Sequence, residues 1–111
     1  DLHYPLRRQR QMCIRDSFIN LSKKLIGDKL GESNIPIAYV GDTIADINTV
    51  INARKEIPSQ KFISIGIAPP HLHLKSRLKE RNAYEKNLIN AGSDLILNSI
   101  NDLRKINLYL F

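Results

Sequence analysis

The sequence has one cysteine, no tryptophan and no long uninterrupted apolar run. The lone cysteine, Cys13, cannot form an internal disulfide, which excludes a disulfide-stapled fold and fits a reducing compartment. Every apolar run is shorter than the roughly 18 residues that a membrane-spanning helix needs. The N-terminus also lacks the apolar stretch of a signal peptide. We therefore expect a cytoplasmic protein with no membrane partner.

What is present is ordinary globular composition, with 42% hydrophobic and 25% charged residues in a chain of 111. That length allows about one small domain with a single core. The formal net charge is +6. Residues 18–111 carry 13 Lys/Arg and 9 Asp/Glu, so 13 − 9 leaves +4, scattered along the chain. No aromatic stacking platform accompanies this charge, so we expect no nucleic-acid partner.

The first seventeen residues look foreign to the rest. The stretch Met12 to Ser17 can be encoded by ATGTGTATAAGAGACAG plus one base, which resembles the transposon end used in sequencing-library adapters. We interpret residues 1–17 as a chimeric tail and residues 18–111 as the domain. The alternative is a natural basic N-terminal arm.

From Phe18 onward, apolar residues recur with the spacing of alternating helices and strands. The short apolar runs ending at Gly41 and Ile67 have the character of strands buried in a parallel sheet. Gly92 is expected to end a helix, and Ser99 to begin one. The predicted helices cover residues 18–26, 46–55, 81–91 and 99–105, and the predicted strands cover 35–40, 62–67 and 94–97, with an irregular segment at 68–79.

This order predicts an α/β fold, a Rossmann-like three-layer parallel sheet with right-handed crossovers. We expect two apolar sets to face inward on the helices: Ile47, Val50 and Ile51; and Ala83, Tyr84, Leu88 and Ile89. The apolar residues of the last helix are Ile100, Leu103 and Ile106. Ligands of such sheets bind outside the carboxyl ends of the strands. Asp42, directly after the first strand, is expected at that edge.

Two carboxylates, Asp42 and Asp46, stand four positions apart where a strand gives way to a helix. Hard oxygen ligands of this kind suit Mg²⁺, which commonly takes one or two protein carboxylates together with waters and a substrate phosphate. Gly41 permits a tight turn beside a ligand, and Thr43 offers a hydroxyl or caps the helix. On spacing alone, simple helix capping is as good an interpretation as metal binding.

Longer stretches carry a family resemblance. The segment from Ile37 to Asp46, IAYVGDTIAD, resembles the fourth motif of haloacid dehalogenase-like hydrolases. The run Phe62 to Ile67 resembles the following strand of that family, and Leu88 to Leu97, LINAGSDLIL, resembles its closing segment. The match runs in order over residues 18–106 and points to the phosphoglycolate-phosphatase-like branch, subfamily IA. The chain is therefore similar to the C-terminal half of such an enzyme core.

The resemblance implies a Mg²⁺-dependent phosphatase that acts on a phosphorylated small molecule through a phosphoaspartyl intermediate. It assigns Asp42 and Asp46 to the metal and makes Gly41 and Thr43 candidates for substrate binding. His71, with His73 beside it, is a further candidate because both follow a strand end; a solvated loop is the alternative for the two histidines. The Asp-x-Asp nucleophile motif is absent from the sequence, so no catalytic residue is assigned and the chain itself is expected to be inactive. The competing hypothesis is a non-catalytic α/β binding or interaction module. Neither hypothesis sets the oligomeric state.

Overall fold

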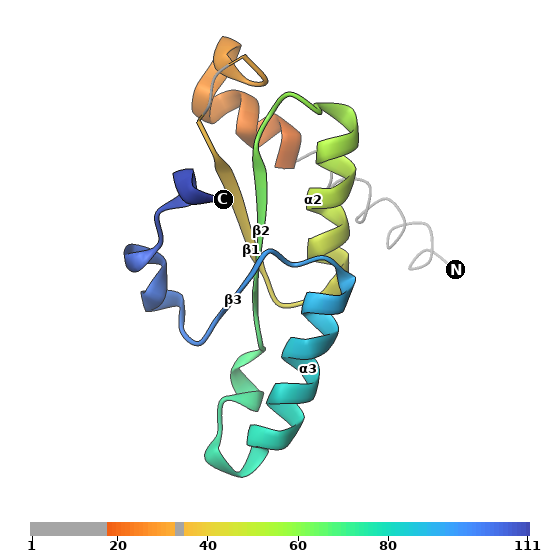
Figure 1. The fold of residues 1–111 in the computed structure, drawn as a ribbon, viewed down its shortest axis with the longest axis vertical. Coiled ribbons are helices and arrows are strands. Elements are labelled where there is room, and N and C mark those ends of the chain that lie inside the picture. Colours follow the sequence, from red (N-terminus) through yellow and green to blue (C-terminus); the bar gives the residue numbers. More distant parts are fainter. Residues whose placement is uncertain (1–17, 33–34) are drawn as a thin grey trace, which may run out of the picture.

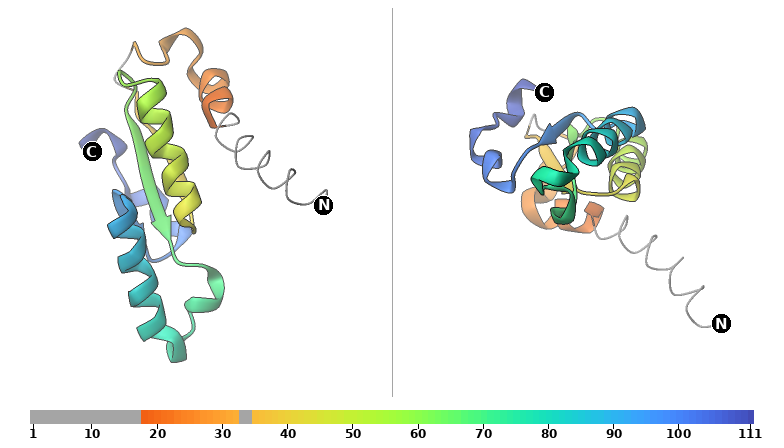
Figure 2. Two further views of the ribbon diagram at one scale, coloured as in Figure 1. Left: turned by 90° about the vertical axis from the view of Figure 1, so that its right-hand side faces the viewer. Right: turned by 90° about the horizontal axis from the view of Figure 1, so that it is seen from below.

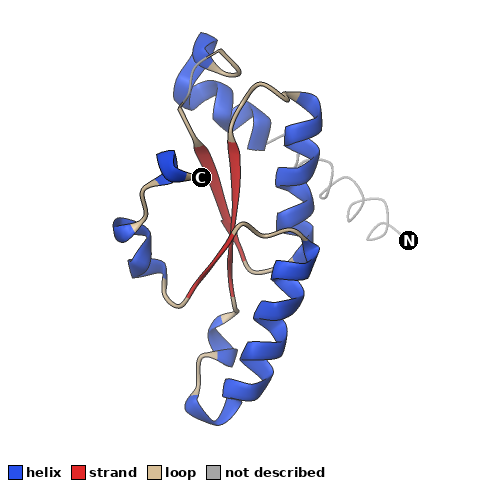
Figure 3. Ribbon diagram, viewed as in Figure 1, coloured by secondary structure: helices blue, strands red, loops and turns tan. Residues whose placement is uncertain are grey.

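The computed structural model describes residues 18–32 and 35–111, so the predicted foreign tail, residues 1–17, lies outside the described residues. Helices and parallel strands alternate along the described chain, which confirms the α/β class (Figures 1 and 3). None of the helices in these two ranges has the length and apolar content needed to cross a bilayer. The elements are a first helix over residues 18–26, β1 (Ile37–Gly41), α2 (Ile44–Glu56), β2 (Phe62–Ile67), α3 (Leu78–Ala91) and β3 (Leu95–Leu97).

The three strands form one parallel sheet in the order β1-β2-β3. Ile37 of β1 lies opposite Phe62, whereas β3 joins β2 further along, with Leu95 opposite Ile65. Right-handed crossovers between strands added in one direction place both connecting helices on the same face of the sheet. Figures 1 and 2 show α2 and α3 on that common side. All three strands therefore end at one edge, where the sequence predicted a site.

The helix-covered face of the sheet holds one apolar cluster. Its aromatic centre is Phe18, whose ring lies 5.0 Å from Tyr39 and 5.3 Å from Phe62, measured between ring centroids. The first helix and α2 are thereby packed against β1 and β2, which fixes the position of the residues that follow β1. The fully clustered residues are Phe18, Ile19, Ile37, Val50, Ala53 and Phe62.

The opposite face of the sheet is covered differently from the prediction. A second apolar cluster, Ile63, Ile65 and Leu97, is covered by Leu103, Ile106 and Leu108 of the C-terminal segment. That segment consists of two 3₁₀ turns, Ile100–Lys105 and Leu108–Leu110, so the α-helix predicted over residues 99–105 is wrong in type. The covering residues are Leu103 in the first turn, Ile106 directly after it and Leu108 in the second turn. Ser99 caps the start of the first turn as predicted, accepting a hydrogen bond from Asn101 N.

Some inward positions were also wrong. In α3, Leu88 is buried and Tyr84 half-buried, but Ala83 and Ile89 are exposed. The helix begins at Leu78, three residues earlier than predicted, and its charged Arg81 and Glu85 occupy the protected side instead. Ile47 and Val50 are buried and Ile51 is half-buried, as expected, whereas the apolar Ile100 is exposed. Helical periodicity identifies the apolar stripe of a helix, but only the part of the stripe that contacts the sheet is buried.

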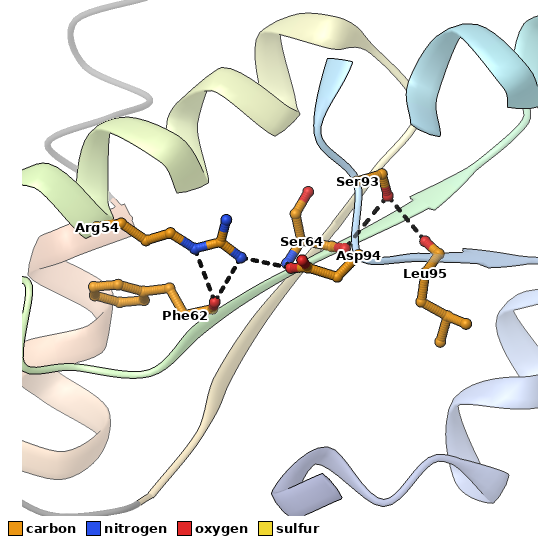
Figure 4. A network of polar contacts seen from close by, with 6 residues as sticks. All are labelled: Arg54, Phe62, Ser64, Ser93, Asp94 and Leu95. Atoms are coloured by element: carbon orange, nitrogen blue, oxygen red, sulfur yellow. Dashed lines mark hydrogen bonds and ion pairs between the residues drawn. The ribbon is translucent and has the colours of Figure 1, made fainter. Parts of the chain in front are cut away.

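A polar clamp joins α2 to the start of β3 (Figure 4). The Arg54 guanidinium donates to the Phe62 carbonyl at 2.9 and 3.1 Å and to Asp94 Oδ2 at 2.5 Å. The same Asp94 oxygen accepts from Ser64 N at 2.8 Å, and Asp94 N donates to Ser64 O. A guanidinium carries several N–H donors and no acceptor, so Arg54 can bind the carbonyl of Phe62 in β2 and the carboxylate of Asp94 at the same time. The clamp sets where β3 begins relative to β2.

The neighbouring residues Leu88 and Ile89 give a matched test of this packing. Leu88 is 1% exposed and Ile89 is 55% exposed. We expect Leu88→Ala to lower the free energy of unfolding by about 2–4 kcal/mol, because it removes buried methyl groups and leaves a cavity. Ile89→Ala should change it by less than about 0.5 kcal/mol. Urea denaturation followed by circular dichroism measures both, and equal losses would contradict the observed orientation of α3.

Candidate metal and substrate site

A cavity of about 630 Å³ opens at the carboxyl ends of the three strands. Each strand contributes the residues at or just beyond its end, so the cavity lies where parallel α/β sheets bind ligands. The wall contributed by β1 is acidic, whereas the walls beyond β2 and β3 are apolar or neutral. None of the described lining residues is Lys or Arg. The lining consists of Val40, Gly41, Asp42, Asp46, Ile67, Ala68, Pro69, Pro70, His73, Asn98, Ser99 and Ile100.

Asp46 organises the turn between β1 and α2. Its Oδ2 accepts hydrogen bonds from Asp42 N at 3.1 Å, Thr43 N at 3.1 Å and Thr43 Oγ1 at 2.8 Å. Thr43 Oγ1 in turn accepts from Asp46 N, completing a capping box at the start of α2. Oδ1 of Asp46 accepts from the Tyr39 hydroxyl at 3.0 Å. The capping interpretation therefore holds for Thr43 and Asp46, and both ends of the Asp46 carboxylate are in use.

Asp42 has the opposite environment. Its side chain is half-buried and lines the cavity, and within the described ranges no hydrogen bond or ion pair engages its carboxylate. Its backbone is held from both sides, since Asp42 N donates to Asp46 and Asp42 O accepts from the Tyr84 hydroxyl of α3. A carboxylate on a fixed backbone, with its oxygens uncommitted, is suited to take a cation.

Gly41 is required by this turn. A Cβ built at residue 41 would lie 2.5 Å from Asp46 Oδ2 and would overlap the rest of that side chain. The absence of a side chain therefore lets the Asp46 carboxylate sit directly against the end of β1. Gly41 also lines the cavity, as its predicted role in substrate binding requires.

Two tyrosines report the negative potential of the site. Burial, reinforced by the charge of Asp46, by its hydrogen bond and by the charge of Asp42, raises the pKa of Tyr39 to about 12. Burial and the charges of Asp42 and Asp46 also raise the pKa of Tyr84. Both phenols stay protonated and act as donors, Tyr39 to the Asp46 carboxylate and Tyr84 to the backbone carbonyl of Asp42.

The other predicted residues divide between the cavity and solvent. His73 lines the cavity, and its Nε2 lies 2.7 Å from the Ala68 carbonyl, whereas His71 is exposed and outside the lining. Thr43 is also exposed and outside the lining, because its hydroxyl is used for capping. The substrate-binding roles of His71 and Thr43 stay predictions.

Sequence reasoning missed the wall beyond β3. Asn98 lines the cavity, and its Oδ1 accepts from Arg81 Nη2 at 2.9 Å. Arg81 also pairs with Glu85 at 3.3 Å, and the two side chains are only 17% and 15% exposed. The signal was available: Asn98 directly follows the apolar run of β3, just as Asp42 follows β1.

The acidic residues of the cavity suit Mg²⁺ that is held by few protein ligands and several waters. No cluster of three or more His, Cys, Asp or Glu able to hold a metal occurs in residues 18–32 and 35–111, so the described residues offer no all-protein cage. Mg²⁺ keeps several waters and needs few protein carboxylates, which Asp42 can supply. Asp46 fits better as the residue that positions Asp42, although its metal role stays a prediction. A cage-forming structural metal such as Zn²⁺ does not match this set.

The contrast between the two acids can be measured as stability. We expect Asp46→Ala to lower the free energy of unfolding by about 1–2 kcal/mol, because it deprives the α2 cap and two backbone amides of their acceptor. Asp42→Ala should change it by less than about 0.5 kcal/mol, since no described group depends on its carboxylate. Denaturation in a metal-free buffer measures both variants. A larger loss for Asp42→Ala would refute the division of roles.

The bond between Tyr39 and Asp46 predicts an alkaline titration. The difference in ultraviolet absorbance between the wild-type chain and Tyr39→Phe should rise near pH 12, not near the ordinary value of 10.0. Because the folded-state pKa is the higher one, the stability contributed by this phenol is complete below pH 10 and is lost as the pH rises toward 12. A difference signal that titrates near pH 10 would contradict both the burial of Tyr39 and its bond to Asp46.

Comparison of the chain with protein-family profiles, with curated proteins and with solved structures finds no match.

Proposed function

We propose that this chain is the metal-binding half of a magnesium-dependent phosphatase core of the haloacid dehalogenase-like type, which hydrolyses a small phosphate monoester. The single observation that carries the proposal is the uncommitted Asp42 carboxylate at the end of a parallel strand, in a cavity without a described Lys or Arg. The sequence resemblance over residues 37–46 points to the same reaction class. The three-stranded parallel sheet is consistent with part of such a core.

Charge explains why a metal is part of the proposal. The chain carries a net charge of +6, yet the lining contributes the two acids Asp42 and Asp46 and no basic residue among those described. A phosphate monoester is an anion, and two carboxylates would repel it. A divalent cation held by Asp42 supplies the missing positive charge and the electrostatic stabilisation of phosphoryl transfer.

The other residues would then have defined tasks. Asp46 holds the amides of residues 42 and 43, and the Tyr84 hydroxyl holds the Asp42 carbonyl, so the metal-binding carboxylate starts from a fixed backbone. Gly41 leaves room for this arrangement. The nucleophile belongs to an Asp-x-Asp strand, which this sequence does not contain. We therefore propose that the 111 residues bind metal and phosphate but do not turn over substrate.

A binding or interaction module remains the second candidate, and one observation favours it. In the described sheet β1 is an edge strand, and its sequence, Ile-Ala-Tyr-Val-Gly, contains neither the Lys nor the Pro that commonly protects such an edge. The outer edge of β1 can therefore pair with a strand of another polypeptide. The phosphatase proposal uses the same edge for the strand that carries the nucleophile, so the two candidates differ in what the cavity binds.

Metal binding separates these candidates. We expect Mn²⁺, used as a paramagnetic substitute for Mg²⁺, to broaden the amide NMR signals of Gly41, Asp42 and Asn98, and excess Mg²⁺ to restore them. Asp42→Asn should weaken the binding at least about tenfold, because it removes the anionic ligand. Asp28→Asn, an acid of the 3₁₀ turn Gly27–Lys29 outside the cavity lining, serves as the matched control. Broadening that is unchanged in Asp42→Asn would overturn the metal assignment and favour the interaction module.

A further inference from the structure

The wall of the cavity beyond β3 is built to present hydrogen-bond donors. Asn98 is exposed at the cavity, and its Oδ1 is taken by Arg81 Nη2 at 2.9 Å. A guanidinium has only donors, so the oxygen of the amide must face Arg81. The Asn98 NH₂ group is therefore the part of the amide that remains for a ligand.

Arg81 is itself held firmly. It pairs with Glu85 one helical turn along α3, and both side chains are more than four-fifths covered. The Nε of Arg81 is paired with Glu85, and its Nη2 donates to Asn98. Because the ion pair holds the guanidinium in place, the bond to Nη2 limits the rotamers of the asparagine. Asn98 is thus oriented in advance by α3.

His73 completes the wall from the other side. Its Nε2 lies 2.7 Å from the Ala68 carbonyl, and a carbonyl can only accept, so the proton is on Nε2. The other ring nitrogen, Nδ1, is left for a ligand. The cavity has an acidic wall at β1 and, beyond β2 and β3, neutral groups that both donate and accept.

We infer that Asn98, oriented by Arg81, is a specificity-determining residue that donates hydrogen bonds to hydroxyl oxygens on the organic part of the substrate. His73, which lines the same cavity, is a second polar contact for that part. The inference rests on the proposed phosphatase function, in which the phosphate lies at Asp42. It assigns the substrate to the class of polyhydroxylated phosphate monoesters, since neutral donors and acceptors match hydroxyl groups and the described lining has no cation for a second anionic group. Arg81 is a positioning residue.

The test compares esters that differ only in the organic part. With Mg²⁺ present, NMR titrations of the full chain measure the binding of methyl phosphate, glycerol phosphate and glucose phosphate. We expect at least one hydroxylated ester to bind more tightly than methyl phosphate and to shift the Asn98 side-chain NH₂ signals, which methyl phosphate leaves in place. Asn98→Ala should weaken that ester about threefold to tenfold, the effect of one lost neutral hydrogen bond, and leave methyl phosphate unchanged.

Two variants separate this role from a structural one. Asn101→Ala, in the same C-terminal segment but outside the lining, is the matched control and should bind every ester as the wild type does. Arg81→Lys keeps the positive charge beside Glu85 but loses the fork that holds Asn98. It should weaken the hydroxylated ester as Asn98→Ala does, and the double variant should be no weaker than Asn98→Ala alone, because both changes remove one interaction.

The failures are distinguishable. If the wild-type chain binds methyl phosphate with Mg²⁺ but Asn98→Ala binds the hydroxylated esters equally well, the inference is refuted and the phosphatase proposal stands. If no hydroxylated ester binds more tightly than methyl phosphate, the inference is refuted in the same way. If no phosphate ester binds in the presence of Mg²⁺, the phosphatase proposal itself fails, and the inference fails with it.

Discussion

The candidate site depends on one carboxylate, that of Asp46, whose two oxygens both accept hydrogen bonds. Asp46 accepts four hydrogen bonds, from the amides of Asp42 and Thr43, the Thr43 hydroxyl and the Tyr39 hydroxyl. These bonds start α2, end β1 and join the turn to the aromatic cluster around Phe18. Because they fix the backbone of Asp42 without using its side chain, they leave the neighbouring acid for a ligand. Structural and functional roles are thus divided between two identical groups four residues apart.

Helix α3 supports the same site from a distance in sequence. Within one helical turn it supplies Tyr84, which holds the Asp42 carbonyl beyond β1, and Arg81, which holds Asn98 beyond β3. Because α3 connects β2 to β3, it lies beside the sheet, and its Arg81 and Tyr84 reach the residues that follow β3 and β1. Two walls of the cavity are therefore positioned by one rigid element, and a shift of α3 would move both.

Electrostatics agree with this arrangement. The chain is basic overall, but Asp42 and Asp46 make the cavity locally negative. Burial, reinforced by the charges of these two acids, raises the pKa values of Tyr39 and Tyr84. Two arginines of the packed helices are already paired, Arg54 with Phe62 and Asp94, and Arg81 with Glu85 and Asn98. Net charge is thus a poor guide to what this cavity attracts, because the local distribution decides the sign.

The sequence by itself determined the class of the fold and the place of the site. Short β-branched runs specify buried parallel strands, Gly41 and Gly92 mark backbone turns, and Asp42 follows a strand directly, all of which depends on residues close together in the chain. Tertiary structure alone decided which groups are used. Asp46 became a cap and Asp42 stayed uncommitted because Tyr39 and Thr43 reach one carboxylate and not the other. Asn98 joined Asp42 in one cavity, and His73, not His71, came to line it, because strands separated by a whole helix end at the same edge of the sheet.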